Sequence, residues 1–412
     1  MADILMDKCT AAKGAFPILA TSTGEMRNKA IALMADALER DCDKILDANA
    51  KDLENAKAAG IRSTLIDRLV LTDARIRAIA ASLRKVAALP DPLGGGTVWN
   101  RPNGMRIRRV HVPIGLIAII YEARPNVTAD AAAICIKSGN ACVLRGGKEA
   151  VLSSIAIVAS VRSALKAAGL PEDCVQIVED TTRESSNRLM TMNGVVDLLI
   201  PRGGRSLIRA VVDNATVPVI ETGAGNCHVY VEKSADIDMA LELVYNAKTS
   251  RPSVCNAAES LLVDREIAAE FLPRLRTRMP EVELRGCEEA LAILEGITPA
   301  TEEDYYTEYN DYVMSVKVVG SIDEAIAHIN ETGTMHSELI VTRDVAAADR
   351  FTAAVDAAAV YVNVSTRFTD GEEFGFGAEI GISTQKFHAR GPMGPEELTT
   401  QKYIIEGNGQ TR

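Results

Sequence analysis

The chain has 412 residues, of which 47% are hydrophobic and 25% charged, and its formal net charge is -11. A chain of this size and composition buries a large core and divides into two or three domains. The acidic balance argues against a nucleic-acid partner, because binding to a duplex requires a basic surface that neutralises phosphates.

The N-terminal segment and the longest apolar run predict a cytoplasmic protein without a membrane contact. Asp3 and Asp7 stand where a secretory signal has basic residues and an apolar core. The apolar run 112–121 is well short of the roughly 20 residues that a membrane-spanning helix requires. The eight cysteines show no CxxC spacing, so we expect reduced thiols and no metal site.

The first hundred residues predict amphipathic helices. Apolar side chains recur at helical spacing over 29–60, 63–71 and 72–96. The third stretch ends on Pro, Asp, Pro and three glycines, which together are a strong stop signal.

From residue 105 strands alternate with helices. Strands are expected over 106–121, 141–147, 175–179, 195–201 and 218–221, and helices over 127–140, 149–169, 182–194 and 204–215. Alternation at these lengths predicts a parallel, doubly wound sheet with helices on both faces. A dinucleotide is the usual ligand of such a sheet.

A second alternating block predicts a second α/β domain. Strands are expected over 258–264, 282–286, 312–320, 337–342 and 360–365, and helices over 234–250, 267–279, 287–296, 322–333 and 345–358. The tail over 371–407 is glycine-rich and then strand-like, with too few apolar residues for a core of its own. We therefore expect the tail to pack against another part of the protein, for which another subunit is our candidate.

Two Arg-Gly-Gly turns stand where a predicted strand gives way to a helix. They are Arg145, Gly146 and Gly147, and Arg202, Gly203 and Gly204. The N–H groups and positive end of a helix N-terminus bind anions at such places. Glycine also makes tight turns without any ligand, and the residues alone leave both interpretations open. A GxGxxG motif does not follow the first strand, so the standard dinucleotide pattern is absent.

Five long segments carry a resemblance to a known family. They read IIYEARPNVTADAAAICIKSGNACVLRGGKEA, ETGAGNCHVYVE, RPSVCNAAE, AIAHINETGTMHSELIVT and STRFTDGEEFGFGAEIGIS. These segments resemble the gamma-glutamyl phosphate reductase (glutamate-5-semialdehyde dehydrogenase) family, within the aldehyde dehydrogenase superfamily. The resemblance extends from the N-terminal helices almost to the C-terminus.

The resemblance implies an aldehyde dehydrogenase-like α/β fold. It comprises two doubly wound domains, one for the cofactor and one catalytic, and in addition a small β oligomerisation element. The implied bounds are 1–104 and 119–226 for the NADP-binding domain, 227–385 for the catalytic domain, and 105–118 with 386–412 for the oligomerisation strands.

The implied reaction is the NADPH-dependent reduction of L-glutamyl 5-phosphate to L-glutamate 5-semialdehyde, with release of phosphate, in proline biosynthesis. The resemblance also implies a homo-oligomer and leaves open a contact with the glutamate kinase that would supply the substrate. Three rivals remain: a hydrolytic NAD(P)-dependent aldehyde dehydrogenase acting on a small semialdehyde, an inactive scaffold or binding protein with this fold, and a reductase of another acyl phosphate, such as an aspartyl one.

Cys255 is the candidate nucleophile. It lies in a short polar loop between a predicted helix and a predicted strand. A thiolate displaces phosphate from an acyl phosphate and leaves a thioester, which accepts hydride far more readily than a carboxylate does. A buried inert thiol is the usual fate of a free cysteine, but the polar loop and the family motif favour catalysis. The other seven cysteines are expected to be structural.

Two further residues complete the expected catalytic set. Asn126 matches the superfamily asparagine that, with the backbone N–H of Cys255, donates to the oxygen on which negative charge grows. A helix N-cap is its alternative role, and the two roles are compatible. Glu221 matches the carboxylate that activates water in hydrolytic members. Because water would destroy the thioester, we expect Glu221 to be idle or displaced.

The cofactor site is expected to combine the two Arg-Gly-Gly turns with two other residues. Glu308 matches the superfamily glutamate that binds the nicotinamide ribose, although a solvated acid in an acidic run is the alternative. Arg145 and Lys148 follow a strand after which superfamily members often carry an acid that binds the adenosine ribose. Two cations suit a 2′-phosphate better than two hydroxyls, so we predict NADPH over NADH.

Arginines are the candidates for binding the substrate. Arg124 and Arg367, with Ser365, are candidates for the α-carboxylate, because arginine binds a carboxylate through two hydrogen bonds. Arg251 either favours the thiolate, holds the departing phosphate or is a solvated surface residue. His228 and His336 fall within the family segments, and we expect structural hydrogen bonds there rather than acid or ligand roles.

Overall fold

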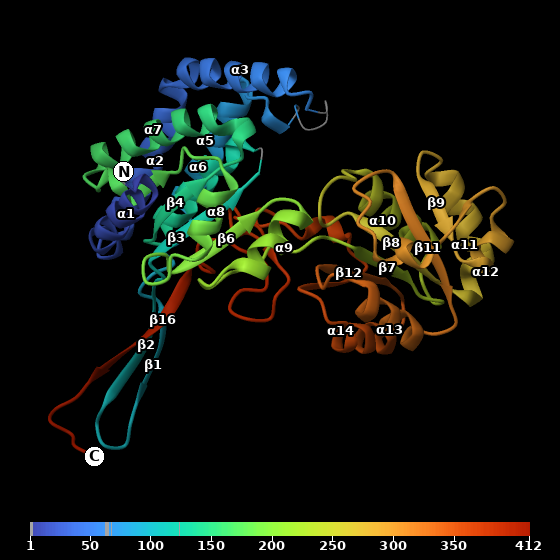
Figure 1. Ribbon diagram of the computed structural model, residues 1–412. Helices are drawn as coiled ribbons and strands as arrows, with labels where there is room; N and C mark the ends of the chain where they lie inside the picture. Colours follow the sequence, from blue (N-terminus) through green and yellow to red (C-terminus); the bar gives the residue numbers. More distant parts are fainter. Residues whose placement is uncertain (1–2, 62–65, 67, 123) are drawn as a thin grey trace. The chain divides into compact units, whose positions relative to one another are not determined.

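The computed structural model describes residues 3–61, 66, 68–122 and 124–412 (Figure 1). The chain forms two compact units. Unit 1 comprises Met1–Glu221, Gly375–Gly381 and Met393–Arg412, and unit 2 comprises Thr222–Phe374 and Ile382–Pro392. The chain thus first leaves unit 1 after 221, where we predicted a boundary at 226, and the tail contributes to both units. Of the helix predicted over 63–71, residues 63–65 and 67 lie outside the described residues.

Unit 1 contains a parallel four-stranded sheet and its covering helices. The strands are β3 (Leu116–Tyr121), β4 (Ala141–Arg145), β5 (Val175–Ile177) and β6 (Leu198–Arg202), in the order β5-β4-β3-β6. The helices are α1 (Ile4–Ala20), α2 (Gly24–Arg40), α3 (Cys42–Ala58), α5 (Asp73–Ala88), α6 (Pro125–Lys137), α7 (Val151–Ala168), α8 (Arg183–Met190) and α9 (Arg205–Asn214), with short 3-10 helices η1 (Lys148–Ala150) and η2 (Glu172–Cys174).

The core of unit 1 is built around β3, all six residues of which are buried. Leu116 and Ile120 pack in one cluster with Leu5 and Cys9 of α1. A strand covered on both faces requires a continuous apolar run, and LIAIIY is such a run.

Helix α7 packs among the other helices of unit 1. Residues 148–168 are long and apolar enough to cross a membrane by length and composition. Half of the most apolar window is buried, and α7 packs against α2, α3 and α6. Because a helix that is apolar on most sides is as typical of a protein core as of a membrane, this packing accounts for its composition.

The single strand predicted over 106–121 is wrong. The segment forms two strands in different sheets: β2 (Arg106–Pro113) pairs antiparallel with β1 (Gly96–Asn100) and β16 (Thr399–Glu406), whereas β3 belongs to the parallel sheet. Pro113 has no N–H to donate. Gly115 has φ 145°, and a Cβ there would lie 2.0 Å from Oδ2 of Asp197. The chain therefore turns at 114–115, and β1 is an element that the sequence did not predict.

Two other predicted elements also differ. The helix expected over 29–60 is two helices, α2 and α3, which are separated by Asp41. The strand expected over 218–221 is reduced to an isolated bridge between Leu199 and Val219. Pro218 next to that bridge lacks an N–H group, which limits the pairing to this point.

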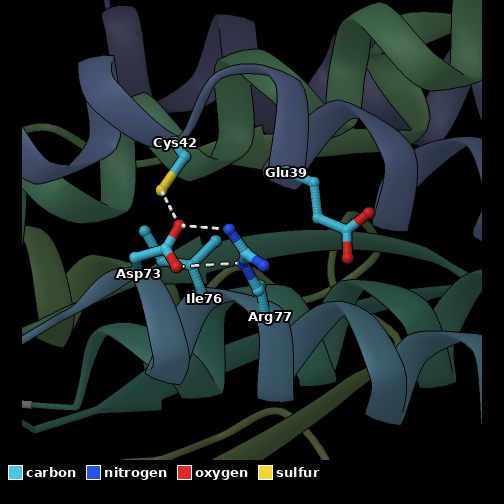
Figure 2. A pocket seen from close by; sticks show the side chains of 5 residues that line it. All are labelled: Glu39, Cys42, Asp73, Ile76 and Arg77. Atoms are coloured by element: carbon cyan, nitrogen blue, oxygen red, sulfur yellow. Dashed lines mark hydrogen bonds and ion pairs between the residues drawn. The ribbon is translucent and has the colours of Figure 1, made fainter.

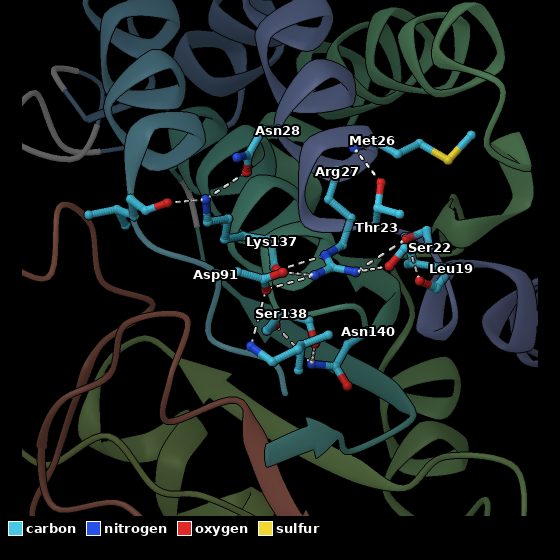
Figure 3. A network of polar contacts seen from close by, with 12 residues as sticks. Leu19, Ser22, Thr23, Met26, Arg27, Asn28, Asp91, Lys137, Ser138 and Asn140 are labelled. Atoms are coloured by element: carbon cyan, nitrogen blue, oxygen red, sulfur yellow. Dashed lines mark hydrogen bonds and ion pairs between the residues drawn. The ribbon is translucent and has the colours of Figure 1, made fainter. Parts of the chain in front are cut away.

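A buried polar network ties the N-terminal helices to the rest of unit 1 (Figure 3). Arg27 of α2 donates to both carboxylate oxygens of Asp91, at 2.7 and 2.8 Å, and to the carbonyl oxygen of Lys137, at 3.2 Å. Nζ of Lys137 donates to Asn28 Oδ1 at 2.6 Å and to the carbonyl oxygen of Leu89. Burial lowers the pKa of Lys137 to about 8. These contacts connect α2 to the last residue of α6 and to the segment that follows α5.

Unit 2 contains a parallel seven-stranded sheet in the order β10-β9-β11-β8-β7-β12-β13. Its strands are β7 (Cys227–Val231), β8 (Ala258–Asp264), β9 (Glu283–Gly286), β10 (Thr298–Pro299), β11 (Val313–Val319), β12 (Ser337–Val341) and β13 (Ala359–Val362). Its helices are α10 (Ile237–Thr249), α11 (Arg265–Arg278), α12 (Glu288–Ile293), α13 (Ile322–Thr332), α14 (Val345–Ala354), η3 (Glu302–Tyr306) and η4 (Thr366–Phe368), and β14 (Ile382–Ser383) pairs with β15 (Gly391–Pro392).

Helices cover both faces of the unit 2 sheet. Val229 and Val231 of β7 pack in a cluster with residues of α10, α11 and α12. Tyr230, which points the opposite way, packs with residues of α13 and α14, including Phe351. Alternate residues of one strand therefore serve two helical layers, as a doubly wound sheet requires. The predicted fold class, with two doubly wound α/β domains, is confirmed.

Candidate active site

The Cys255 loop connects α10 to β8, the strand next to β7 in the unit 2 sheet. Cys255 is half-buried, and its carbonyl oxygen accepts a hydrogen bond from Sγ of Cys227 at 3.1 Å. Cys227 is the first residue of β7, so the loop lies at the amino ends of two adjacent parallel strands.

Gly225 allows the closest backbone approach in this loop region. A Cβ on Gly225 would lie 1.5 Å from the carbonyl oxygen of Cys255 and 2.6 Å from its Cα, so any larger residue would collide with backbone. The N–H of Gly225 donates to Oε1 of Glu308 at 2.8 Å. Glu308 is half-buried, and the alternative of a merely solvated acid is therefore wrong. Cys255 and Glu308 therefore both lie against the same glycine.

Asn256 holds the nucleophile loop against η4. Its Nδ2 donates to the carbonyl oxygens of Arg367, at 3.2 Å, and Thr369, at 2.9 Å. Its Oδ1 accepts from Nη1 of Arg367, and Nε of Arg367 donates to Ser250 Oγ at 3.0 Å. The sequence reasoning missed Asn256, whose place beside the cysteine was the available signal.

Three expected substrate residues lie around the same loop. Burial, together with the charge of Arg251, lowers the pKa of Arg367, and the charge of Cys255 acts in the opposite direction. Arg251 itself is exposed, as a group that receives an anion must be. Ser365 is buried, and its Oγ accepts the N–H of Arg367 at 3.3 Å as the N-cap of η4, so it shapes the loop.

Most other cysteines have surroundings that suppress their reactivity. All eight lie in the described part of the chain, and none forms a disulfide. Burial raises the pKa of Cys9 to about 11 and that of Cys174 to about 12. Burial also raises the pKa of Cys227, and a hydrogen bond from the Cys142 thiol to Cys135, with burial, raises the pKa of Cys142. These thiols stay protonated at neutral pH, as expected for structural cysteines.

His228 and His336 contribute to buried hydrogen-bond networks. Nδ1 of His228 lies 3.0 Å from Oε2 of Glu338, and its Nε2 lies 3.0 Å from Oγ1 of Thr332. Nδ1 of His336 lies 2.8 Å from Oγ of Ser337. Both rings are fully buried, in agreement with the structural roles predicted for them.

The second set of predicted residues lies at the carboxyl ends of β3, β4 and β6 in unit 1. The strand order reverses direction at β3, because β4 and β5 lie on one side of it and β6 on the other. Ligands of open α/β sheets bind outside the carboxyl ends at such a switch point. Arg124 and Asn126 follow β3, and the turn of Arg202, Gly203 and Gly204 follows β6.

The turn after β6 already accepts an anionic group from the chain itself. Oε2 of Glu122 accepts the N–H of Gly204 at 2.8 Å, and the N–H of Glu122 donates to the carbonyl oxygen of Arg202 at 3.0 Å. A Cβ on Gly203 would lie 2.7 Å from the carboxylate carbon of Glu122. The glycines thus form an N–H cradle that fits a carboxylate, which the sequence reasoning did not anticipate.

Asn126 is not an N-cap. Helix α6 begins at Pro125, so its N-cap is Arg124, and Asn126 lies within the first turn. The side chain of Asn126 is exposed, and its Nδ2 donates to Oδ2 of Asp130 at 3.5 Å. Burial raises the pKa of Asp130 to about 6, and Asn126 and Arg202 act against this rise. The capping alternative is wrong, and Asp130 is an unpredicted neighbour.

Arg145 and Lys148 differ in how they are engaged. Nη2 of Arg145 donates to the carbonyl oxygens of Thr181, at 2.6 Å, and Thr182, at 2.9 Å, and burial lowers its pKa. Lys148 is exposed at the start of η1. A Cβ on Gly146 would lie 3.2 Å from the ring of Tyr121, so this glycine permits a tight turn. Arg145 therefore holds the segment that contains Thr181 and Thr182, whereas Lys148 presents its charge to solvent.

The predicted catalytic residues are divided between the two units. Asn126 belongs to unit 1, and Glu221 is its last residue before the chain enters unit 2, where Cys255 lies. Glu221 is half-buried. The sequence reasoning did not single out Gly225, for which the glycines of ETGAGNC were the available signal.

A surface hollow of about 300 Å³ lies on the helices of unit 1 (Figure 2). Its lining residues are Glu39, Cys42, Asp73, Ile76 and Arg77. Sγ of Cys42 donates to Oδ1 of Asp73 at 3.7 Å, and Nε of Arg77 lies 2.9 Å from the other carboxylate oxygen. The hollow includes none of the predicted site residues; Asp73 and Arg77 pair within it, and Glu39 pairs with Arg84.

The fold and the cysteine loop define a class of protein. The model of the aldehyde dehydrogenase family matches residues 5–294 and 293–379. The chain belongs to the aldehyde dehydrogenase family.

Full-length relatives narrow this class. The chain is 56% identical over 411 residues to gamma-glutamyl phosphate reductase of Clostridium perfringens, covering 99% of both proteins, and 57% identical over 404 residues to that of Moorella thermoacetica, covering 97% of both. The crystal structure of gamma-glutamyl phosphate reductase from Thermotoga maritima is 48% identical, with a TM-score of 0.98 and complete coverage of both chains. Within the family the chain therefore groups with the gamma-glutamyl phosphate reductases.

Proposed function

We propose that this chain reduces L-glutamyl 5-phosphate to L-glutamate 5-semialdehyde, with NADPH as the hydride donor and phosphate as the second product, in proline biosynthesis. The observation that carries the proposal is the half-buried thiol of Cys255 on a loop that also holds Arg251 and that is hydrogen-bonded to Arg367 of η4, in a chain 56% identical to a gamma-glutamyl phosphate reductase. A small-molecule substrate and a nicotinamide cofactor follow from the family.

Cys255 forms the covalent intermediate in this proposal. Its thiolate attacks the C5 carbonyl carbon, the bond from that carbon to the phosphate oxygen breaks, and phosphate leaves with the bonding pair. Bound NADPH would supply a hydride to the resulting thioester. Collapse of the tetrahedral centre then breaks the carbon–sulfur bond and returns the thiolate of Cys255.

Other residues of the chain support these steps. Asn126 and the N–H of Cys255 donate to the oxygen on which charge develops. Arg251, Arg367 and Arg124 are the cations for the departing phosphate and the substrate carboxylate, because a guanidinium binds either anion through paired hydrogen bonds. Glu221 is expected to stay idle, since an activated water would hydrolyse the thioester.

The residues at the strand ends of unit 1 fit a dinucleotide. The N–H of Gly204 donates to a carboxylate oxygen of Glu122, and this contact supports assigning the turn to an anion such as a pyrophosphate. Gly146 and Gly147 with Lys148 form the corresponding turn after β4, with Arg145 and Arg202 as the last residues of their strands. Glu308 would hold the nicotinamide ribose.

Replacing Lys148 by Glu is expected to raise KM for NADPH at least about tenfold, and KM for NADH far less. A charged hydrogen bond to the 2′-phosphate is lost and a repulsive charge is introduced, and NADH has no 2′-phosphate. Initial rates with each cofactor measure the effect. Lys166→Glu, at the exposed far end of α7, is the matched control and should change neither constant. Equal effects of Lys148→Glu on both cofactors would contradict the preference.

We infer a homo-oligomer through the sheet of β1, β2 and β16. Val98, Trp99, Tyr403 and Ile405 are exposed on its outer strands, with exposed fractions of 38 to 57%. The rings of Trp99 and Tyr403 pack edge to face at 6.2 Å, so apolar side chains gather on this sheet. The strands β2 and β16 of this sheet lie within the bounds 105–118 and 386–412 that we proposed for this element. A contact with the glutamate kinase and the cytoplasmic location stay predictions.

The reverse reaction separates the proposal from its rivals. Glutamate 5-semialdehyde and NADP+ are expected to yield NADPH only when inorganic phosphate is present, because phosphate must release the acyl group from Cys255. Absorbance at the NADPH band, with and without phosphate, measures this. Oxidation at the same rate without phosphate would establish a hydrolytic dehydrogenase instead. Aspartate semialdehyde in a parallel assay tests the aspartyl rival.

A further inference from the structure

A buried ion pair lies at the base of the Cys255 loop. Lys248 is in the last turn of α10, and Glu259 is the second residue of β8, so the pair closes the loop at both of its ends. Nζ of Lys248 lies 2.5 Å from Oε2 of Glu259, and both side chains are fully buried. Neither residue has a place in the reaction as proposed above.

The second carboxylate oxygen of Glu259 reaches the segment that carries Glu308. Oε1 of Glu259 accepts the backbone N–H of Asn310 at 3.1 Å. Asn310 has φ 56°, a left-handed conformation that is uncommon for residues other than glycine. Its side chain donates to the carbonyl oxygen of Glu308 at 3.4 Å. Glu308 in turn accepts the N–H of Gly225, which lies against Cys255.

The pair is a poor device for stability alone. Taking two charges out of water costs more than their attraction commonly returns, and apolar residues of similar volume often stabilise a fold at least as well. Burial lowers the pKa of Lys248 and raises that of Glu259 to about 7, while the charge of each partner acts in the opposite direction. What the pair adds over an apolar contact is the directed hydrogen bond to Asn310.

We propose that Lys248 and Glu259 are positioning residues: through the loop ends and Asn310 they hold Cys255 and Glu308 in the arrangement that hydride transfer requires. The inference rests on the proposed function, because it assigns the nicotinamide ribose to Glu308. It adds to that function a buried pair that contributes without contacting the substrate or the cofactor.

The test removes the charges and keeps the volume. The double variant Lys248→Met with Glu259→Leu is expected to keep the wild-type Tm within a few degrees, because the buried apolar pair packs in the same space. Its Kd for NADPH, measured from the fluorescence of the bound cofactor, is expected to rise roughly tenfold, and its kcat to fall about a hundredfold. A purely structural pair predicts unchanged kinetics in any variant that folds.

Two outcomes of this experiment overturn the proposal. A double variant that fails to fold shows that the charges are required for stability, and a folded one with wild-type Kd and kcat shows that they position nothing. Lys233→Met is the matched control, since it breaks an exposed pair with Glu266, also in unit 2, and should leave all three quantities unchanged.

A double-mutant cycle asks whether the pair acts through Glu308. In a Glu308→Ala background, the Lys248→Met and Glu259→Leu changes are expected to raise Kd for NADPH by less than about twofold further. Fully additive effects would refute the route through Asn310. Cofactor binding needs no turnover, so this result stands even if phosphate dependence fails, and the two failures are distinguishable.

Discussion

Cys255→Ala is expected to lower kcat by at least about a thousandfold, because the thioester cannot form and a variant enzyme has no second route to an activated acyl group. Binding of NADPH should remain, because Cys255 bonds to the acyl group of the substrate and not to the cofactor. Rates of NADPH consumption and the fluorescence of bound NADPH measure the two effects. Mass spectrometry of a quenched turnover mixture should find the acyl adduct on the peptide that contains Cys255.

Cys42→Ser is the matched control for this variant. Cys42 is also half-buried, but its sulfur donates to Asp73, and burial with that carboxylate raises its pKa. The serine keeps the hydrogen bond, so kcat should stay within about twofold of the wild type. An active Cys255→Ala enzyme, or an adduct on Cys42 in its place, would overturn the assignment of the nucleophile.

Gly225→Ala is expected to lower kcat about a hundredfold although it removes no functional group. The new Cβ would lie 1.5 Å from the carbonyl oxygen of Cys255 and 2.3 Å from its carbonyl carbon, and backbone atoms must move to relieve the contact. A displacement of about 1 Å at a reacting group costs a factor of this size. The same movement draws the N–H of Gly225 away from Glu308, so KM for NADPH should also rise.

Gly14→Ala provides the comparison for this second prediction. Gly14 lies in the interior of α1, and a Cβ there meets nothing within 4 Å. Alanine has the higher helix propensity, so this variant should keep its kcat and gain up to about 1 kcal/mol in the free energy of unfolding. Thermal unfolding of both variants separates loss of geometry from loss of fold. A Gly225→Ala enzyme with unchanged kcat and KM would show that the loop tolerates displacement.

The candidate active-site loops of unit 2 do not lie at the carboxyl ends of strands, where ligands of open α/β sheets generally bind. Gly225 precedes β7, and Cys255 precedes β8, so both lie at amino ends of parallel strands. The residues proposed to bind the cofactor in unit 1 lie at carboxyl ends, in agreement with the rule. The proposed nucleophile and the proposed dinucleotide turns therefore occupy opposite kinds of strand end, which strand and helix prediction alone does not reveal.

The sequence by itself determined the fold class and the alternation of strands and helices in both units, and it supplied Cys255 as the candidate nucleophile, because periodicity and motif chemistry are local properties of the chain. The segment 106–121, which we predicted as one strand, shows where local information ends. Pro113 and the approach of Asp197 to Gly115 divide it between two sheets. Asp197 lies 82 residues further along the chain than Gly115, so no local pattern reveals their contact.

Only the tertiary structure decided which groups meet. Glu308 and Gly225 are 83 residues apart, and Asn256 and Thr369 are 113 apart, yet each pair shares a hydrogen bond beside Cys255. The carboxylate of Glu122 at Gly204 and the buried pair of Lys248 and Glu259 are likewise absent from any local pattern. Hydrogen bonds form between atoms about 3 Å apart irrespective of chain distance, so only the packing of sheets and helices selects these partners.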